Sequence, residues 1–158
     1  QYITMKKYFE TTVKHTVTLE DGTSKKVTDS YLVDAMSFTE AEARTAEFVS
    51  CYYEDYSIIR EKISTFSEVL APNNYDDGIY YNAKVSYIIL DEKSGKEKKL
   101  PQRLCVYADT PNEAIDIIEA SLKNSMTEYV IEELKSTNIT DIIAYEKTDI
   151  HNSKSSNG

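Results

Sequence analysis

YFETTVKHTVTLEDGTSKK, residues 8–26, and YNAKVSYIILDEKSGKEKK, residues 81–99, decide the fold of this chain. Each stretch alternates apolar and polar residues, reaches an acidic turn that contains a glycine, and ends in a lysine pair. Alternation with a period of two is typical of a half-buried strand, and Gly22 and Gly95 suit the turn of a hairpin. The two stretches therefore predict two β-hairpins of the same kind.

The similarity extends beyond the hairpins. At a shift of 73 positions Val33 meets Val106 and Ala35 meets Ala108, and residues 66–70 match residues 139–143 type for type. Upstream of the turns the shift is 72, as Tyr8 and Tyr80 show, because the second turn has one extra residue. A fixed period of this kind indicates a repeat, so we expect a tandem duplication.

Each repeat is expected to have the order β–β–α–β. First strands are predicted over residues 8–19 and 80–90, and third strands over residues 56–63 and 129–134. Each helix is expected to begin with a capping box, in which a Ser or Thr side chain and a Glu three residues later satisfy free backbone N–H groups. The pairs are Ser37 with Glu40 and Thr110 with Glu113.

The predicted fold class is α+β, a tandem duplication of a ββαβ unit forming one compact pseudo-twofold domain with mainly antiparallel sheet. The domain is expected over residues 1–146, with repeats at 6–70 and 79–146, a linker at 71–78 and a polar flexible tail at 147–158. A ββαβ unit covers one sheet face with a single helix. Two units can complete each other by joining edges or by packing faces, and the sequence leaves both arrangements open.

The charge limits the classes of partner. The chain has 18 basic and 27 acidic residues, a formal net charge of -9. This balance argues against bulk attraction to nucleic acid or anionic lipid, although it permits a local basic patch. No apolar run approaches the roughly 20 residues that span a bilayer, and no early apolar run resembles a secretion signal. We therefore expect no membrane association and a cytoplasmic location.

No motif of strong chemical specificity is present. The glycines form no phosphate-binding loop, and Cys51 and Cys105 have no metal-binding spacing. Both cysteines are expected to be small core residues in a reducing compartment. His15 stands where the second repeat has Tyr87, so it is either a satisfied core residue or a ligand or general base. We predict no catalytic residue, no cofactor and no metal, and hence no enzyme.

Tyrosine is the first feature above background, with 13 tyrosines and no tryptophan. Tyrosine joins apolar area to a polar tip, which suits protein interfaces as well as ordinary packing of a sheet. The predicted contact surface for a protein partner or a second copy consists of Tyr52, Tyr53, Tyr56, Tyr75, Tyr80 and Tyr81.

Lysines at the hairpins are the second such feature. Paired basic hairpins can hold a phosphate backbone, but acidic residues lie beside these lysines, which favours a solvated hairpin of mixed charge. The candidate anion-binding residues are Lys25, Lys26, Lys96, Lys98 and Lys99.

YLVDAMSFTEAEA, residues 31–43, and LDEKSGKEKK, residues 90–99, carry a family resemblance. With the overall length, they resemble an uncharacterised family of unknown function found in gut Bacteroidales and their phages or mobile elements. The similarity covers residues 6–145. It implies an intracellular, phage-associated setting, in a bacterial cell or a phage-infected host, and assigns no catalytic or ligand role to any residue.

The leading hypothesis is a small non-catalytic intracellular module that binds a protein partner or a second copy. The first alternative is binding of nucleic acid or another anionic ligand through the lysine-bearing hairpins. The second alternative is an enzyme of unrecognised type, which would need a deep pocket with perturbed carboxylates or a histidine.

Overall fold

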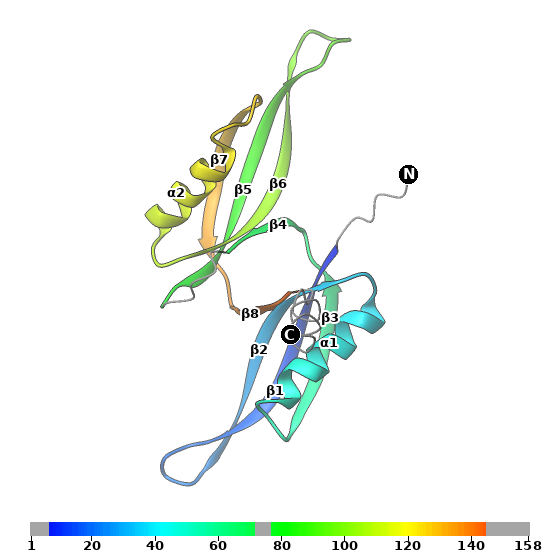
Figure 1. Ribbon diagram of the computed structural model, residues 1–158, viewed down its shortest axis with the longest axis vertical. Helices are drawn as coiled ribbons and strands as arrows, with labels where there is room; N and C mark the ends of the chain where they lie inside the picture. The colour runs from blue at the N-terminus through cyan, green and yellow to red at the C-terminus, as the bar shows by residue number, and fades with distance from the viewer. Residues whose placement is uncertain (1–6, 72–76, 145–158) are drawn as a thin grey trace, which may run out of the picture. The chain divides into compact units, whose positions relative to one another are not determined.

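The computed structural model describes residues 7–71 and 77–144 of the chain. Eight strands and two helices lie in these residues (Figure 1). They follow in the order β1 (Lys7–Thr18), β2 (Ser24–Ala35), α1 (Phe38–Ser50), β3 (Tyr56–Ile63), β4 (Phe66–Leu70), β5 (Ile79–Leu90), β6 (Glu97–Ala108), α2 (Pro111–Leu122), β7 (Glu128–Ser136) and β8 (Ile139–Ile143). The predicted α+β class with mainly antiparallel sheet is confirmed.

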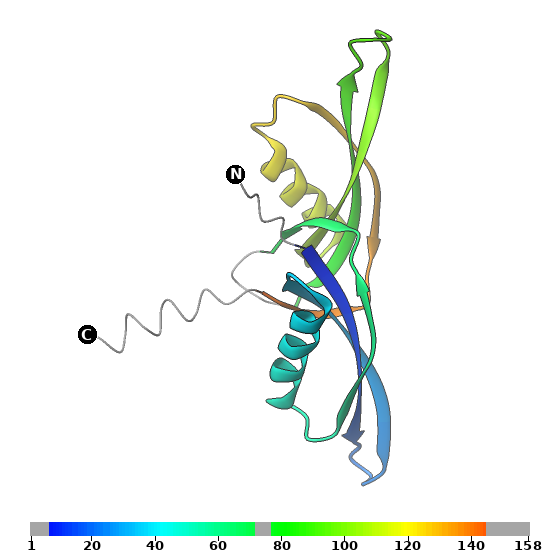
Figure 2. The same cartoon turned by 90° about the vertical axis from the view of Figure 1, so that its right-hand side faces the viewer.

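The elements form two compact units. Of the described residues, unit 1 comprises 7–64 and 140–144, and unit 2 comprises 65–71 and 77–139. Each unit has its own four-stranded sheet, with strand order β3-β1-β2-β8 in unit 1 and β4-β6-β5-β7 in unit 2. Each sheet carries its helix on one face only (Figure 2).

The short strands β4 and β8 are exchanged between the units. β4 follows β3 of unit 1 along the chain but pairs in parallel with β6 of unit 2. β8 follows β7 of unit 2 but takes the edge beside β2 of unit 1. The sequence leaves edge joining and face packing open, and its repeat pattern predicts neither these two strands nor their exchange. Each ββαβ segment is thus completed by the short strand that follows the other segment's last strand.

The two units share one pairing register. Lys7 pairs with Ala35 in unit 1, and the corresponding Ile79 pairs with Ala108 in unit 2. The edge strands β3 and β7 have a bulge at corresponding positions. Ile59 is the extra residue of β3, and Glu132, 73 positions later, is the extra residue of β7. The shifts of 72 and 73 positions seen in the sequence are therefore also the shifts that relate the two structures.

Both helices begin as the sequence predicts. The Ser37 side chain accepts a hydrogen bond from the Glu40 backbone N–H at 3.1 Å, and Thr110 does the same for Glu113 at 3.1 Å. The glutamates complete the boxes less directly, since their carboxylates accept from the backbone N–H of Met36 and of Asp109. Each cap satisfies donors that the first turn of a helix leaves free.

The two cores lie between helix and sheet and correspond position by position. Unit 1 buries Val13, Val33, Ala35, Ala41 and Ile143, where unit 2 buries or half-buries Val85, Val106, Ala108, Ala114 and Leu70. The last pair comes from the exchanged strands, so β8 and β4 contribute to cores as well as to sheet edges. Burying one such aliphatic side chain stabilises a fold by roughly 1.5–3 kcal/mol.

A pair of threonines sets the core of unit 1 apart. Thr11 on β1 and Thr45 on α1 are fully buried, and their hydroxyl oxygens lie 3.0 Å apart in a hydrogen bond. Thr45 also donates to the Ala41 carbonyl at 2.8 Å. Unit 2 has Ala83 and Ile118 at the corresponding positions, also fully buried. The same layer of the fold is therefore built once with a polar pair and once with a small and a large apolar residue.

Several boundaries differ slightly from expectation. The third strand of unit 2 extends over Glu128–Ser136, beyond the predicted residues 129–134. Most of the predicted linker and the predicted tail lie outside the described residues, so the single-domain limits 1–146 stay a prediction.

Within residues 7–71 and 77–144, no helix combines the length and apolar character needed for crossing a bilayer.

Candidate functional site

A groove runs between α1 and β3 of unit 1. Its lining residues are Thr39, Glu42, Ala43 and Ala46 from α1 with Tyr56 and Ile58 from β3. The helix and the strand are joined by a short turn and run in opposite directions, so Tyr56 lies near the end of α1 and donates a hydrogen bond to the Ala46 carbonyl at 3.4 Å. The groove is open at the helix because the two alanines have short side chains.

Two carboxyl groups border this groove. Glu42 is exposed on α1, and Glu61 is half-buried on β3. Burial raises the pKa of the Glu61 carboxyl, and the charge of Glu42 and a hydrogen bond with Glu42 raise it further. The two side chains therefore lie close enough to interact, and ionising both is unfavourable. The groove carries local negative character that a bound cation would relieve.

Unit 2 has different residues at the corresponding positions. Ile115 and Leu134, both half-buried, replace the pair of Glu42 and Glu61. Asp116 and Glu119, both exposed, replace Ala43 and Ala46. Since unit 2 adopts the same register with apolar residues across this helix–strand seam, the fold does not require carboxylates there.

A second polar cluster of unit 1 surrounds His15 on β1. His15 Nε2 lies 2.6 Å from Asp29 Oδ2, and only 2% of the His15 side chain is exposed. The Tyr53 ring, in the turn after α1, stacks on the imidazole with 3.7 Å between ring centroids and 15° between planes. His15 Nδ1 is buried without a hydrogen-bond partner among the described residues. The imidazole is therefore held by Tyr53 on one ring face and by Asp29 at Nε2, and only one of its two nitrogens has a hydrogen-bond partner in the described part of the chain.

Two tyrosines complete the cluster. The Tyr31 hydroxyl donates to Asp29 Oδ2 at 3.3 Å. Burial raises the pKa of Tyr31 well above its ordinary value, and the charge of Asp29 adds to the effect. Burial also raises the pKa of Tyr53, again with a contribution from Asp29. Both phenols stay protonated at neutral pH, so they are hydrogen-bond donors and not bases.

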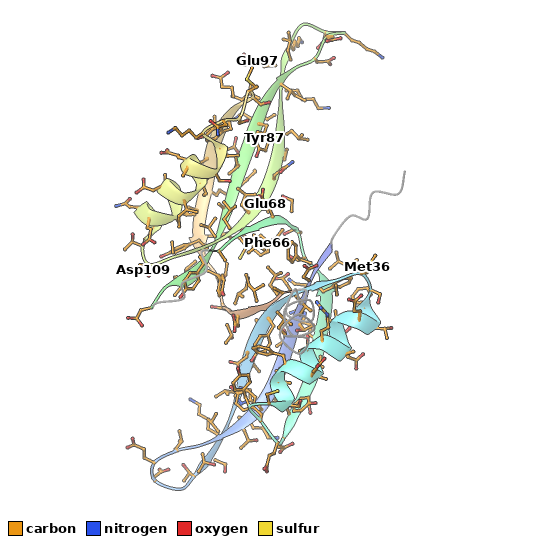
Figure 3. The ribbon with its side chains drawn as sticks, viewed as in Figure 1. Met36, Phe66, Glu68, Tyr87, Glu97 and Asp109 are labelled. Carbon is orange, nitrogen blue, oxygen red and sulfur yellow. The ribbon has the colours of Figure 1, made fainter. Side chains whose placement is uncertain are left out.

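In unit 2 the cluster is absent. Tyr87, Gln102, Leu104 and Met126 stand where unit 1 has His15, Asp29, Tyr31 and Tyr53. Tyr87 lies on β5, and Glu68 lies on the exchanged strand β4 (Figure 3). Burial raises the pKa of Tyr87, and the charge of Glu68 contributes. The His15 cluster is thus a property of one unit, and the common fold forms without it.

The predicted contact tyrosines differ in how exposed their side chains are. Tyr52 is 67% exposed at the end of α1, while Tyr53 and Tyr56 are half-buried against the core of unit 1. Tyr80 and Tyr81 are both buried: Tyr81 packs in the core of unit 2, and the Tyr80 ring packs on that of Tyr107. Tyr75 lies outside the described residues. The predicted surface therefore narrows to Tyr52, Tyr53 and Tyr56, and Tyr56 lines the groove.

The candidate lysines Lys25, Lys26, Lys96, Lys98 and Lys99 are all exposed, on two hairpins of different units. Lys99 Nζ lies 2.9 Å from Glu132 Oε1, and Lys84 lies 3.5 Å from the same carboxylate. The hydrogen bond from Lys99 lowers the pKa of Glu132. Lys99 is thus occupied by an acid of its own unit, which weakens it as an anion contact.

Cysteines and acids offer no metal centre in the described part of the chain, where no group of three or more His, Cys, Asp or Glu is suitably placed. Cys105 is buried as expected. The expectation that Cys51 is a core residue is wrong, because it caps the C-terminal end of α1 and is exposed.

The groove acids were missed by reading each motif separately. The signal lay in comparing the repeats at the shift of 73 positions. Glu42 and Glu61 are charged where the corresponding residues of the second repeat, Ile115 and Leu134, are apolar. The same comparison finds His15 against Tyr87.

Fold and groove define a small α+β protein of two similar units, one of which has an acid-lined groove between a helix and an edge strand. The chain belongs to the family described as "Domain of unknown function (DUF4494)", whose model matches residues 7–145. This agrees with the resemblance to an uncharacterised family. No curated protein matches the chain.

Proposed function

We propose that the chain is a non-catalytic binding module and that a protein partner docks on the α1–β3 groove of unit 1. One observation carries the proposal. Two units with the same register differ at this seam, where unit 1 has short alanines and an acid pair and unit 2 has apolar and bulkier residues. A fold does not need the features that only one copy has, so their role is sought in binding.

The tyrosines near the groove support the same location. Tyr56 lines the groove, and Tyr52 is exposed just after α1. Aromatic side chains of this kind are enriched at protein interfaces, since they bury large area at low entropy cost. The groove acids lie on an open surface and not in a deep pocket, which favours binding over catalysis.

The test transplants unit 2 residues into unit 1. Full-length chain and the variant Ala43→Asp/Ala46→Glu are immobilised, and proteins captured from native cells are quantified. Ala43 is exposed and Ala46 is half-buried, and α2 carries Asp116 and Glu119 at the corresponding positions, so the fold should persist, as circular dichroism will check. We expect capture of the specific partner to fall roughly tenfold or more, the size of an interface hot spot.

The matched control is Asp116→Ala/Glu119→Ala at the corresponding positions of unit 2. It should leave capture unchanged. Equal capture by all three proteins would place the partner elsewhere, and no specific capture by the wild-type chain would reject the binding module itself.

We also infer that the two units arose by duplication and that the module works in the cytoplasm of a bacterial cell or phage-infected host. Support for duplication comes from the shared register and the shared bulge. Support for the phage or mobile-element setting comes from the sequence resemblance alone.

Anion binding by the hairpins remains the alternative, with Lys25, Lys26, Lys96 and Lys98 as its main contacts. It predicts affinity for nucleic acid that falls steeply with salt, because each phosphate contact releases counterions. A gel shift at low salt that disappears in Lys96→Gln/Lys98→Gln would favour it, and no shift at low salt would remove it.

A further inference from the structure

We propose that the partner contributes an extended peptide segment that adds to β3 as a further strand and places a lysine or arginine between Glu42 and Glu61. This inference rests on the proposed function, because it concerns the same groove. It names the chemistry of the ligand, which the docking proposal leaves open.

β3 offers the backbone for such an addition. It is an edge strand, and among the described strands it pairs with β1 alone. One row of its N–H and C=O groups therefore faces away from the sheet, and such a row is a template for an incoming strand. Ile59 and Ile63 on β3 are 54% and 52% exposed, so an added strand would also cover apolar area.

The bulge at Ile59 limits the length of the added strand. The ladder with β1 is regular from Ile63 to Arg60 and again from Ile58 to Tyr56, with the extra residue between them. Bulges twist an edge and interrupt pairing, which protects it from indiscriminate association. The geometry points to a short segment whose pairing is confined to one or both of these runs.

The groove offers the side-chain specificity. In a strand added to β3, every second side chain points toward the helix side, where Ala43 and Ala46 leave room and Ile58 provides an apolar wall. Glu42 and Glu61 lie on the same side of the sheet. A basic side chain there would make charge-assisted hydrogen bonds to carboxylates that otherwise repel each other.

Unit 2 supplies an internal comparison. Its edge strand β7 has the same bulge, but Asp116 and Glu119 replace the alanines, and Ile115 and Leu134 replace the acid pair. A basic segment would find larger side chains at the seam, and the two carboxylates there, Asp116 and Glu119, both lie on the helix, with Leu134 facing them from β7 in place of Glu61. The proposal therefore assigns the peptide to unit 1 only.

The experiment uses a displayed library of random peptides of about 12 residues and the immobilised full-length chain. Selected peptides should alternate apolar and polar residues around a Lys or Arg. Synthetic copies should bind Glu42→Gln/Glu61→Gln roughly tenfold or more weakly, and should bind Asp116→Asn/Glu119→Gln as they bind the wild type. Hydrogen exchange with the peptide bound should show new protection of β3 amides and none of β7 amides.

Three results would overturn the inference: selected peptides without a basic residue, affinity unchanged by the two glutamine substitutions, or a library that yields no binder. Selected peptides that protect β7 in place of β3 would overturn it as well. If partner capture is lost in Ala43→Asp/Ala46→Glu while the library yields no binder, the groove docks a folded surface, and only this inference fails. Size-exclusion chromatography checks for a second copy. If the wild-type chain elutes as a dimer and Ala43→Asp/Ala46→Glu elutes as a monomer, a second copy occupies the groove, and the inference of a partner peptide is overturned.

Discussion

The backbone N–H of Ser30 donates a hydrogen bond to Oγ1 of Thr140 at 3.3 Å, although 110 residues separate them in the chain. The contact joins β2 to the exchanged strand β8. In unit 2 the Ser67 hydroxyl on β4 makes the corresponding kind of contact, donating to the Arg103 carbonyl of β6 at 3.1 Å. Each sheet is thus completed by a five-residue strand that follows the last strand of the other ββαβ segment, and neither ββαβ segment has its complete sheet alone.

The exchange predicts crossed destabilisation. Ile143 is buried in the core of unit 1, and Leu70 packs against the core of unit 2. Ile143→Ala should therefore weaken unit 1, by about 2–4 kcal/mol for a buried large-to-small change, and Leu70→Ala should weaken unit 2 by less, because Leu70 is only half-buried. Hydrogen exchange read separately in β1 and in β5 measures both.

The crossed pattern is the part that can fail. If each short strand completed the sheet that precedes it, Ile143→Ala would loosen β5 and Leu70→Ala would loosen β1. That outcome would contradict the strand order described here.

The sequence shows why the exchange is hard to foresee. Residues 66–70 and 139–143 match type for type, so their equivalence is visible. Strand propensity, however, reflects how a side chain fits a half-buried surface and does not specify a pairing partner. Only two residues, Ser64 and Thr65, separate β3 from β4, and nothing in them indicates that the chain leaves one sheet for another. Local patterns gave the hairpins and helices, and the partner of a five-residue strand is decided by the tertiary fold.

The threonine pair predicts strong coupling. Thr45→Val removes the hydroxyl that bonds Thr11 and leaves a buried polar atom unpaired, which costs about 1–3 kcal/mol. The double variant Thr11→Ala/Thr45→Ile reproduces the Ala83 and Ile118 pair of unit 2. Its loss of stability should be smaller than the sum of the losses caused by the two single substitutions. A double-mutant cycle with chemical denaturation measures the coupling. Additive effects would show that the two units do not accommodate equivalent residues at this layer.

Helix capping gives a matched pair of predictions. Ser37→Ala and Thr110→Ala each remove an oxygen that accepts from the first turn of a helix, and each should cost about 1 kcal/mol. Ser37→Thr keeps the acceptor and serves as the control, with a change of a few tenths of a kcal/mol. Thermal unfolding of the three variants checks this, and an alanine variant as stable as the wild type would contradict the role of the cap.

The candidate site was only partly predictable. The sequence predicts Tyr56 as a contact and it lines the groove, whereas Tyr80 and Tyr81, predicted because they cluster with Tyr75 around the linker, are buried. Tyr80 packs on Tyr107 with ring centroids 4.9 Å apart, while Tyr81 lies in the core under α2. Clustering in sequence cannot distinguish these cases, since neighbouring strand residues face opposite ways. The acid pair needed the proximity of α1 to β3, which no single motif contains.

The groove acids predict a pH-dependent difference in stability. The pKa of Glu61 is raised in the folded chain, so the proton is bound more tightly there than in the unfolded chain. The stability that this group contributes is complete below its unfolded pKa of about 4.3 and is lost as pH rises through the folded pKa. Glu61→Gln stays neutral at every pH. It should therefore be more stable than the wild type at pH 7, and the difference should vanish near pH 3, as chemical denaturation at the two pH values will show.

Glu133→Gln is the control of opposite sign. A hydrogen bond from Arg103 lowers the pKa of Glu133, so its contribution is complete above the unfolded pKa and is lost as pH falls through the folded pKa. Glu133→Gln should be no more stable than the wild type at pH 7, and the free energies of unfolding of the two proteins should become equal in acid. The Glu133 effect will be small because its side chain is exposed to screening solvent. If Glu61→Gln were less stable than the wild type at pH 7, the fold would stabilise the charged form of the Glu61 carboxyl. The groove would then have no uncompensated negative charge for a basic side chain to neutralise.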